Sequence, residues 1–139
     1  MAYWLFKSEP DVWSWQNQFD RGAAGEEWHG IRNYGARNNM RSMVLGDQGF
    51  FYHSNIGKEI MGIVEVCRLS QPDSTTDDPR WDCVCIRGLR PLLRPVGLQD
   101  CKVQPGLEKM VLINNSRLSV QPVTPDEWQI ICGMGGIAP

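Results

Sequence analysis

The segment from Phe50 to Leu69, FFYHSNIGKEIMGIVEVCRL, constrains the fold of this chain more than any other segment does. FFYHSN is rich in aromatic residues, and EIMGIVEVCRL alternates its apolar residues in a way that predicts a β-strand. The residues NIGK between the two runs are typical of a tight turn. The segment therefore predicts a β-hairpin, so the domain contains an antiparallel sheet.

Three further segments have the composition of strands. AYWLFK lies near the N-terminus, and RLSVQPV lies near the C-terminus. RWDCVCIRGLRPLL lies between them. Pro91 within this segment and Pro95 just after it mark the end of a strand or an edge of the sheet, because proline cannot donate a ladder hydrogen bond. Five or so strands suggest a small, partly closed β-barrel.

Short helices are predicted between the strands. One follows SEPD, where Ser8 is the expected N-cap and Pro10 occupies the first turn. A second covers residues 33–44, where apolar residues recur at helical spacing. The apolar stripe of this second helix consists of Ala36, Met40, Met43 and Val44. A third helix, TPDEWQII, has Thr124 as its cap, and GLQDCKVQPGLEKMVLI is a short irregular or helical piece.

Length, charge and cysteine content limit the class of protein. A chain of 139 residues suits one domain over 1–139, with residues 133–139 (GMGGIAP) as a loose tail. The formal charge of -2 excludes a generally basic surface that wraps duplex nucleic acid, but it leaves room for a local basic patch. No run approaches the roughly 20 apolar residues of a membrane span, so no membrane partner is expected. The odd number of cysteines, 5, favours a reducing compartment, the cytoplasm or the nucleus of a eukaryote.

Cations, amides and rings are concentrated in WHGIRNYGARNNMR, which begins at Trp28. The segment contains Arg32, Arg37 and Arg41 and no carboxylate, although the chain is acidic. Two interpretations are open: a core tryptophan followed by a solvated helix face, or a nucleotide-sized site with a stacking ring and phosphate-binding arginines. FFYHSN offers the second half of such a site. Its stacking surface and hydrogen-bond donors are Tyr52, His53, Ser54 and Asn55.

Catalytic and metal-binding signatures are missing from the sequence. It contains no phosphate-binding glycine loop, no G-x-S-x-G and no H-E-x-x-H. His53 and Ser54 are neighbours on a predicted strand, where successive side chains point to opposite faces, so they are a poor base and nucleophile pair. Cys83 and Cys85 fit a buried core better than a zinc site, and PDSTTDD fits a solvated turn better than a calcium loop. The sequence therefore predicts no catalytic residue, no metal and no cofactor.

The series YWLFKSEP, WHGIRNYGARNNMR, GDQGFFYHSN, IMGIVEV and RLSVQPVTPDEW resembles the EVE domain, over nearly the whole chain and in the family's order. The resemblance implies an α+β, PUA-like fold, which is a mixed β pseudo-barrel of about five or six strands with short helices at its ends. It also implies a relationship to the YTH readers of methylated adenine. Such a domain holds a modified base of DNA or RNA in an aromatic-lined pocket.

A weaker similarity to the YTH pattern implies where that pocket lies. By this resemblance Trp28 is a wall of the aromatic cage, Ser8 and Asn55 fix the base, and its other walls have no clear counterpart. The candidates for these other walls are Trp4, Trp15 and Trp81. Asn33 is a further orienting amide, and three residues are placed beside the pocket by sequence adjacency: Tyr34, His53 and Ser54. Three arginines face the flanking phosphates or brace the loop through internal pairs: Arg32, Arg37 and Arg41.

The sequence thus predicts a monomeric reader that binds modified DNA or RNA and catalyses no reaction. Two alternatives stay open. The first is an enzyme that acts on a modified nucleobase, with His53 as the acid–base group. The second is a protein that binds a free small molecule such as a modified nucleoside. Its affinity would not fall with salt, as the affinity of a phosphate-binding protein does.

Overall fold

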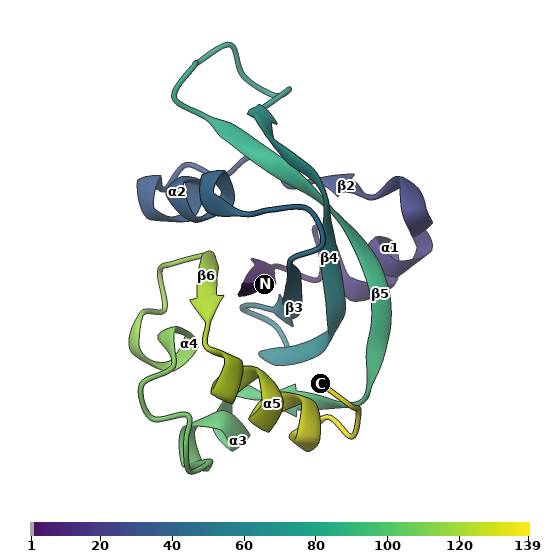
Figure 1. Cartoon of the computed structure of the whole chain (residues 1–139), viewed down its shortest axis with the longest axis vertical. Coiled ribbons are helices and arrows are strands. Elements are labelled where there is room, and N and C mark those ends of the chain that lie inside the picture. The colour runs from purple at the N-terminus through teal and green to yellow at the C-terminus, as the bar shows by residue number, and fades with distance from the viewer. Residues whose placement is uncertain (1) are drawn as a thin grey trace.

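A computed structural model describes residues 2–139, which form a six-stranded mixed sheet with short helices at both of its ends (Figure 1). The strands are β1 (Tyr3–Ser8), β2 (Glu26–Glu27), β3 (Gln48–His53), β4 (Glu59–Pro72), β5 (Asp82–Gly97) and β6 (Val120–Val123). The helices are α1 (Trp15–Asp20), α2 (Tyr34–Ser42), α3 (Leu98–Val103), α4 (Val111–Asn114) and α5 (Pro125–Met134), with a 3-10 helix, η1, at Gly22–Ala24. The predicted α+β, PUA-like class is confirmed.

The strand order in the sheet is β2-β5-β4-β3-β1-β6. β1 and β3 run parallel, and every other neighbouring pair is antiparallel. The predicted hairpin is confirmed, because β3 pairs with β4 across the turn at residues 54–58. Within residues 2–139 no strand pairing joins β2 to β6, so the sheet is curved but not closed.

The long strand β5 continues through both of its prolines instead of ending there. Pro91 lies opposite Gly62 of β4, and the strand runs on to Gly97. On its other side β5 pairs with β2 only, at Cys85 and Ile86. Within residues 2–139, the part of β5 that contains the prolines has no strand partner other than β4, and such an edge is where proline is tolerated.

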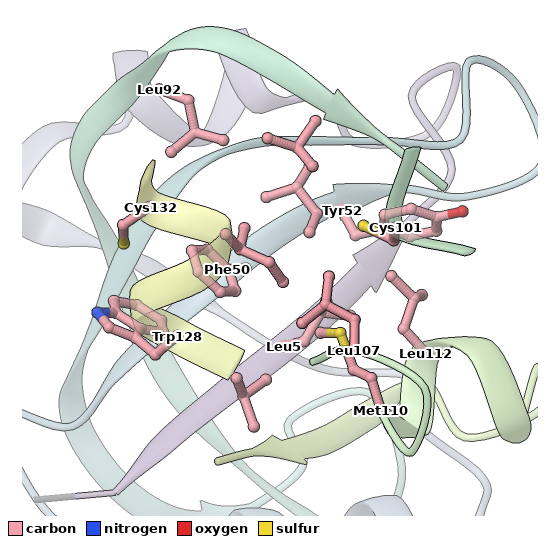
Figure 2. Close-up of a cluster of buried hydrophobic side chains, with 14 of the residues drawn as sticks. Leu5, Phe50, Tyr52, Leu92, Cys101, Leu107, Met110, Leu112, Trp128 and Cys132 are labelled. Atoms are coloured by element: carbon pink, nitrogen blue, oxygen red, sulfur yellow. The ribbon is translucent and has the colours of Figure 1, made fainter. Parts of the chain in front are cut away.

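Two hydrophobic clusters cover the two faces of the sheet. Successive residues of a strand point to opposite faces, so Leu5 and Phe50 enter one cluster, whereas Phe6 and Phe51 enter the other. Figure 2 shows the first cluster, in which Trp128 of α5 stacks on Phe50. The second cluster lies on the side of α1 and α2 and includes five buried aromatic rings: Trp4, Phe6, Trp15, Trp28 and Phe51.

The first helix starts later than the sequence predicts. Ser8 ends β1, and its carbonyl oxygen accepts a hydrogen bond from the backbone N–H of Ser54, so pairing with β3 holds it extended. Residues 9–13 form a turn. The N-cap of α1 is Ser14, which forms a capping box with Asn17. The prediction of Ser8 as the cap is therefore wrong.

The second and last helices also differ in detail from the sequence prediction. α2 ends at Ser42 because Met43 is extended, so Val44 leaves the apolar stripe and is 55% exposed. α5 begins after its predicted cap, Thr124, but continues to Met134, into the predicted loose tail. Beyond it, the carbonyl oxygen of Gly135 accepts a hydrogen bond from the backbone N–H of Arg94. In the described chain no helix is long and apolar enough to cross a bilayer.

Candidate functional site

A cavity of about 490 Å³ opens between the turn that follows β1 and the loop that follows β2. One side is lined by Lys7, Ser8, Glu9, Val12 and Trp13. The other side is lined by Glu26, Glu27, Trp28, His29, Gly30 and Ile31. Ligand sites in proteins have volumes of roughly 300–1,000 Å³, so the cavity is large enough for a small organic group.

Trp28 is both a core residue and a wall of the cavity. Its side chain is 7% exposed and meets Phe6 and Phe51 edge-on, with ring centroids 5.6 Å and 5.8 Å away. Its backbone N–H donates to the carbonyl oxygen of Val84. The indole is therefore fixed from behind by the core, while another part of it faces the cavity.

Trp13 is the second aromatic wall, and the sequence analysis did not identify it. Its Nε1–H donates to Oε1 of Gln18 at 2.9 Å, and the fully buried Gln18 amide donates in turn to the carbonyl oxygen of Ile86 at 3.0 Å. The hydroxyl of Ser8 donates to the carbonyl oxygen of Trp13 at 2.6 Å. Two hydrogen bonds, one to the indole and one to its backbone carbonyl, therefore hold Trp13 in place before any ligand arrives. The sequence signal for this wall is the tryptophan itself, but a helix capped by Ser8 would have included Trp13.

The three tryptophans considered as further walls do not line the cavity. Trp4 donates its Nε1–H to the buried Asp47, and Trp15 packs in the core against Phe51. A Cβ added to Gly62 would lie 2.3 Å from the Trp15 ring, so the glycine makes room for that indole. Trp81 stacks on Tyr34 instead.

Of the base-binding residues predicted from the sequence, Ser8 and Trp28 line the cavity. Asn33 caps α2 by accepting the backbone N–H of Ala36. Tyr34 is 50% exposed and stacks on Trp81 with ring centroids 5.0 Å apart. Neither Asn33 nor Tyr34 lines the cavity.

The β3 end of the predicted site lies beside Ser8 but outside the cavity lining. The β1–β3 register places His53 opposite Ser8, and Ser54 donates its N–H to Ser8, whereas Asn55 adopts a positive φ of 68° in the following turn. Tyr52 is buried in the first core cluster (Figure 2), so it is not a stacking surface.

His53 is poorly placed for acid–base chemistry. Its Nε2 accepts a hydrogen bond from the backbone N–H of Trp15 at 2.9 Å, which occupies that lone pair. Burial lowers the pKa of His53 below its usual value, which keeps the ring neutral near pH 7. A neutral imidazole with this acceptor in use stabilises the start of α1 and cannot take a proton at Nε2.

Two of the three predicted phosphate-facing arginines are paired with carboxylates inside the protein. Nη1 of Arg32 lies 3.1 Å from Oδ2 of Asp73, and Nε of Arg41 lies 2.8 Å from Oδ1 of Asp82. Arg37 has no ion-pair partner among residues 2–139, and its guanidinium lies 4.8 Å above the Tyr34 ring. The expected internal pairs therefore exist for Arg32 and Arg41.

PDSTTDD is largely the solvent-exposed turn that the sequence predicts, but Asp73 within it is buried. Its side chain is 2% exposed and accepts hydrogen bonds from Gly30, Arg32 and Thr75. Burial alone would raise the pKa of Asp73, but these hydrogen bonds outweigh it and lower the pKa well below its usual range. An ionised carboxylate thus holds the loop on which Trp28 and Gly30 lie.

Three carboxylates, those of Glu9, Glu26 and Glu27, lie in the polar lining of the cavity beside Lys7, Ser8 and His29. Oε1 of Glu26 lies 3.4 Å from Nε of Arg21, and Oε1 of Glu27 accepts hydrogen bonds from the backbone and hydroxyl of Ser74. The ammonium of Lys7 donates to a backbone carbonyl oxygen at residue 116, and burial lowers its pKa. In the described part of the chain, no group of three or more acidic, histidine or cysteine side chains is arranged to hold a metal. This arrangement suits a flat apolar ring that has a polar edge.

The EVE domain family matches residues 2–134 of the chain. Thymocyte nuclear protein 1 of Mus musculus is 32% identical over 165 residues, a match that covers 95% of this chain and 73% of the mouse protein. An uncharacterised protein of Schizosaccharomyces pombe is 33% identical, with 93% of this chain and 66% of the yeast protein covered.

Solved structures agree with this match. The crystal structure of an Agrobacterium tumefaciens protein has a TM-score of 0.98 and 58% identity, covering 99% of this chain and 95% of that one. The structure of human THYN1 protein in complex with 5-methylcytosine-containing DNA has a TM-score of 0.86 and 29% identity, and all of both chains is covered (100% each). A Rhodopseudomonas palustris protein has a TM-score of 0.93 and 52% identity, with 98% and 94% covered.

Proposed function

This chain belongs to the EVE domain family, and we propose that it binds nucleic acid and holds a modified, methylated base in the cavity lined by Trp13 and Trp28. The observation that carries the proposal is the pair of fixed indoles at a cavity of about 490 Å³. The DNA complex of human THYN1 protein, which contains 5-methylcytosine, supports the same kind of ligand for this chain.

The energetics favour an inserted base. Removing a base from a duplex costs a few kcal/mol, whereas a single-stranded base avoids most of this cost. Stacking on an aromatic ring stabilises each base by about 1–3 kcal/mol. Because Trp13 and Trp28 are already held by hydrogen bonds and core packing, little further ordering of these two walls opposes binding. A methyl group against an apolar part of the lining adds about 1–3 kcal/mol of discrimination.

The phosphates next to the inserted base stay outside the cavity, on the side of α2. Arg37 is the first candidate for a phosphate contact, because no carboxylate of the described chain neutralises it. Arg32 and Arg41 act mainly through their internal pairs, and Arg32 holds the cavity loop through Asp73. Base selection and phosphate attraction are therefore assigned to different parts of the surface.

Trp13→Ala tests the proposal directly. Trp13 is only partly buried and packs against the second cluster from outside, so its removal deletes no buried member of that cluster. Loss of one stacking wall predicts a fall of about tenfold or more in affinity for single-stranded oligonucleotides that carry 5-methylcytosine or N6-methyladenine, measured by fluorescence polarisation. Val103→Ala is the matched control, because Val103 is 81% exposed on α3 at the opposite end of the sheet (Figure 1).

A folded Trp13→Ala protein that binds these oligonucleotides as tightly as the Val103→Ala control contradicts the proposal. Mass spectrometry of the recovered oligonucleotides completes the test. We propose binding without turnover, so the modified base is expected to be recovered unchanged. A new product would instead support the nucleobase-directed enzyme that the sequence analysis left open.

A further inference from the structure

The charges that line the cavity have one predominant sign. Glu9, Glu26 and Glu27 contribute three carboxylates, whereas Lys7 contributes the one ammonium group of the lining. That ammonium already donates to the carbonyl oxygen of Ser116 at 2.9 Å. None of the three arginines on or before α2 lines the cavity. A ligand edge that faces these three carboxylates therefore meets hydrogen-bond acceptors.

Some of these acceptor positions accept no hydrogen bond within the described chain. Oε2 of Glu27 has Arg68 at 3.6 Å and accepts no hydrogen bond there. The side chain of Glu9 is exposed and takes part in no hydrogen bond or ion pair among residues 2–139. An ionised carboxylate accepts through both oxygens and donates nothing, so its complement in a ligand is an N–H group.

The carboxylates sit on a fixed piece of backbone. Glu26 and Glu27 form β2, which pairs with Ile86 and Cys85 of β5. Burial raises the pKa of Glu27, but hydrogen bonds from Ser74 and the charge of Arg68 outweigh burial and lower it overall. Glu27 is therefore ionised at neutral pH, and its negative charge is a constant feature of the lining.

We infer that the cavity selects bases that carry an exocyclic amino group, such as cytosine and adenine derivatives, over bases with a carbonyl oxygen at that position. This inference rests on the proposed function, and it narrows the ligand from any modified base to one chemical class. An amino group directs two N–H donors at the carboxylates, and glutamate is a normal partner of the cytosine amino group in nucleic-acid recognition. A carbonyl oxygen at the same place directs a partial negative charge at the same carboxylates and leaves them without a donor.

Two single-stranded oligonucleotides of one sequence provide the probe: one carries a single 5-methylcytosine, and the other carries thymine at that position. Both bases have the same C5 methyl group and the same flanking phosphates. They differ at C4, which carries an amino group in one and a carbonyl oxygen in the other, and at the adjacent N3, which is an acceptor in 5-methylcytosine and an N–H donor in thymine. The wild-type protein is expected to bind the 5-methylcytosine strand about tenfold or more tightly. The ratio is expected to be equal at two salt concentrations, because the phosphate contacts are identical in both complexes.

Three single variants, Glu9→Gln, Glu26→Gln and Glu27→Gln, identify the carboxylate that is responsible. At least one of them is expected to reduce the ratio severalfold, because glutamine can donate to the thymine carbonyl as well as accept from the amino group. Glu108→Gln is the matched control, since Glu108 is exposed in the loop between α3 and α4, outside the cavity lining. Equal affinity of the wild type for both strands, or a ratio that no cavity variant changes, overturns the inference.

Failure of the inference is distinguishable from failure of the proposed function. If neither strand binds, or if Trp13→Ala leaves binding to both strands unchanged, the cavity is not the base site and both proposals fall. If Trp13→Ala weakens binding to both strands while the wild type binds them equally, the base site stands and the selection by carboxylates falls.

Discussion

Trp28 and Tyr34 come from one short segment of the sequence, but their rings lie in different surroundings. Trp28 lines an open cavity, whereas Tyr34 stacks on Trp81, and this pair is called the Tyr34–Trp81 stack. Guanidinium groups cover the stack: Arg37 lies 4.8 Å from the Tyr34 ring, and Arg32 lies 5.5 Å from the Trp81 ring. A high density of rings and cations in a sequence therefore does not mark one continuous binding surface.

The two regions also differ in charge. Carboxylates outnumber the single ammonium group in the cavity lining. Around the Tyr34–Trp81 stack, three arginines pair with aspartates: Arg32 with Asp73, Arg80 with Asp78 and Arg41 with Asp82. The Arg32 and Arg41 pairs join the loop before α2 and the last turn of α2 to the β4–β5 hairpin, which extends beyond the rest of the sheet (Figure 1), whereas the Arg80–Asp78 pair lies within the hairpin loop. The Tyr34–Trp81 stack therefore acts as a brace, which means that it stabilises the contact between α2 and the β4–β5 hairpin, whereas the cavity is open to a ligand.

The variants Trp28→Ala and Trp81→Ala have the largest expected effects, and they separate the binding role of the cavity from the structural role of the Tyr34–Trp81 stack. Trp28 is 7% exposed and Trp81 is 8% exposed, so each replacement is expected to lower the free energy of unfolding by about 3–5 kcal/mol in urea denaturation. Trp28→Ala should also abolish the preference for a modified base. Trp81→Ala should preserve that preference in the protein that stays folded.

The two variants are compared by their selectivity for methylated over unmethylated strands and not by their affinity. Destabilisation lowers the fraction of folded protein in both variants, and this lowers the apparent affinity. The ratio of affinities for methylated and unmethylated strands does not depend on that fraction. A Trp81→Ala protein without selectivity, beside a Trp28→Ala protein that keeps it, would reverse the roles assigned to the two regions.

Asp73→Asn tests the connection between the two regions. Asp73 accepts hydrogen bonds from Gly30 in the cavity loop and from Arg32 beside the stack. Hydrogen bonds to a charged group contribute about 1.5–3 kcal/mol, so a loss of about 2 kcal/mol in unfolding free energy is expected at pH 7. A lowered pKa in the folded state means that this stability is present above the unfolded pKa of about 3.9 and is lost as pH falls below it.

The pH dependence gives Asp73→Asn its own control. Wild type and variant should differ most near pH 7 and should converge as the pH falls below about 4. The carboxyl of the unfolded wild-type chain then takes up a proton, while the folded carboxyl, with its lowered pKa, stays ionised. Urea denaturation at pH 7 and pH 3 measures both differences. A difference that is equal at the two pH values would show that the asparagine acts through packing rather than through the lost charge.

Local signals in the sequence were sufficient for most of the fold and for one wall of the cavity. The hairpin around NIGK, the cap at Thr124 and the general position of α2 follow from turn chemistry, capping and spacing. Trp28 was identified through the family resemblance, and the structure places it at the cavity. These features depend on residues that are close together in the chain.

The features that the sequence did not predict depend on residues far apart. SEPDVWSW contains two possible helix caps, Ser8 and Ser14, and pairing of Ser8 with β3 decides between them. That decision releases Trp13 from a helix and places it at the cavity. The burial of Asp73 likewise depends on a hydrogen bond from Gly30, 43 residues away. Neither contact leaves a periodic pattern in the sequence.

Arg37→Ala has the smallest expected effect and sharpens the distinction between free and paired arginines. Arg37 lacks a carboxylate partner within the described chain, whereas Arg41 is paired with Asp82 at 2.8 Å. Each phosphate contact to a single strand adds about 0.7 to the slope of log affinity against log salt. Arg37→Ala is therefore expected to reduce that slope by about 0.7 and to weaken binding equally for methylated and unmethylated strands.

Arg41→Ala is the matched comparison for Arg37→Ala, because both arginines lie on α2 and the variants remove the same charge. The salt slope of Arg41→Ala should change less, because Asp82 already neutralises Arg41. The variant leaves Asp82 unpaired, and this aspartate then repels every oligonucleotide alike, whatever its sequence. Titrations of one oligonucleotide at four salt concentrations provide both slopes. Equal slopes for Arg37→Ala and wild type would place the phosphates elsewhere, and the Tyr34–Trp81 stack with its arginines would then be a brace alone.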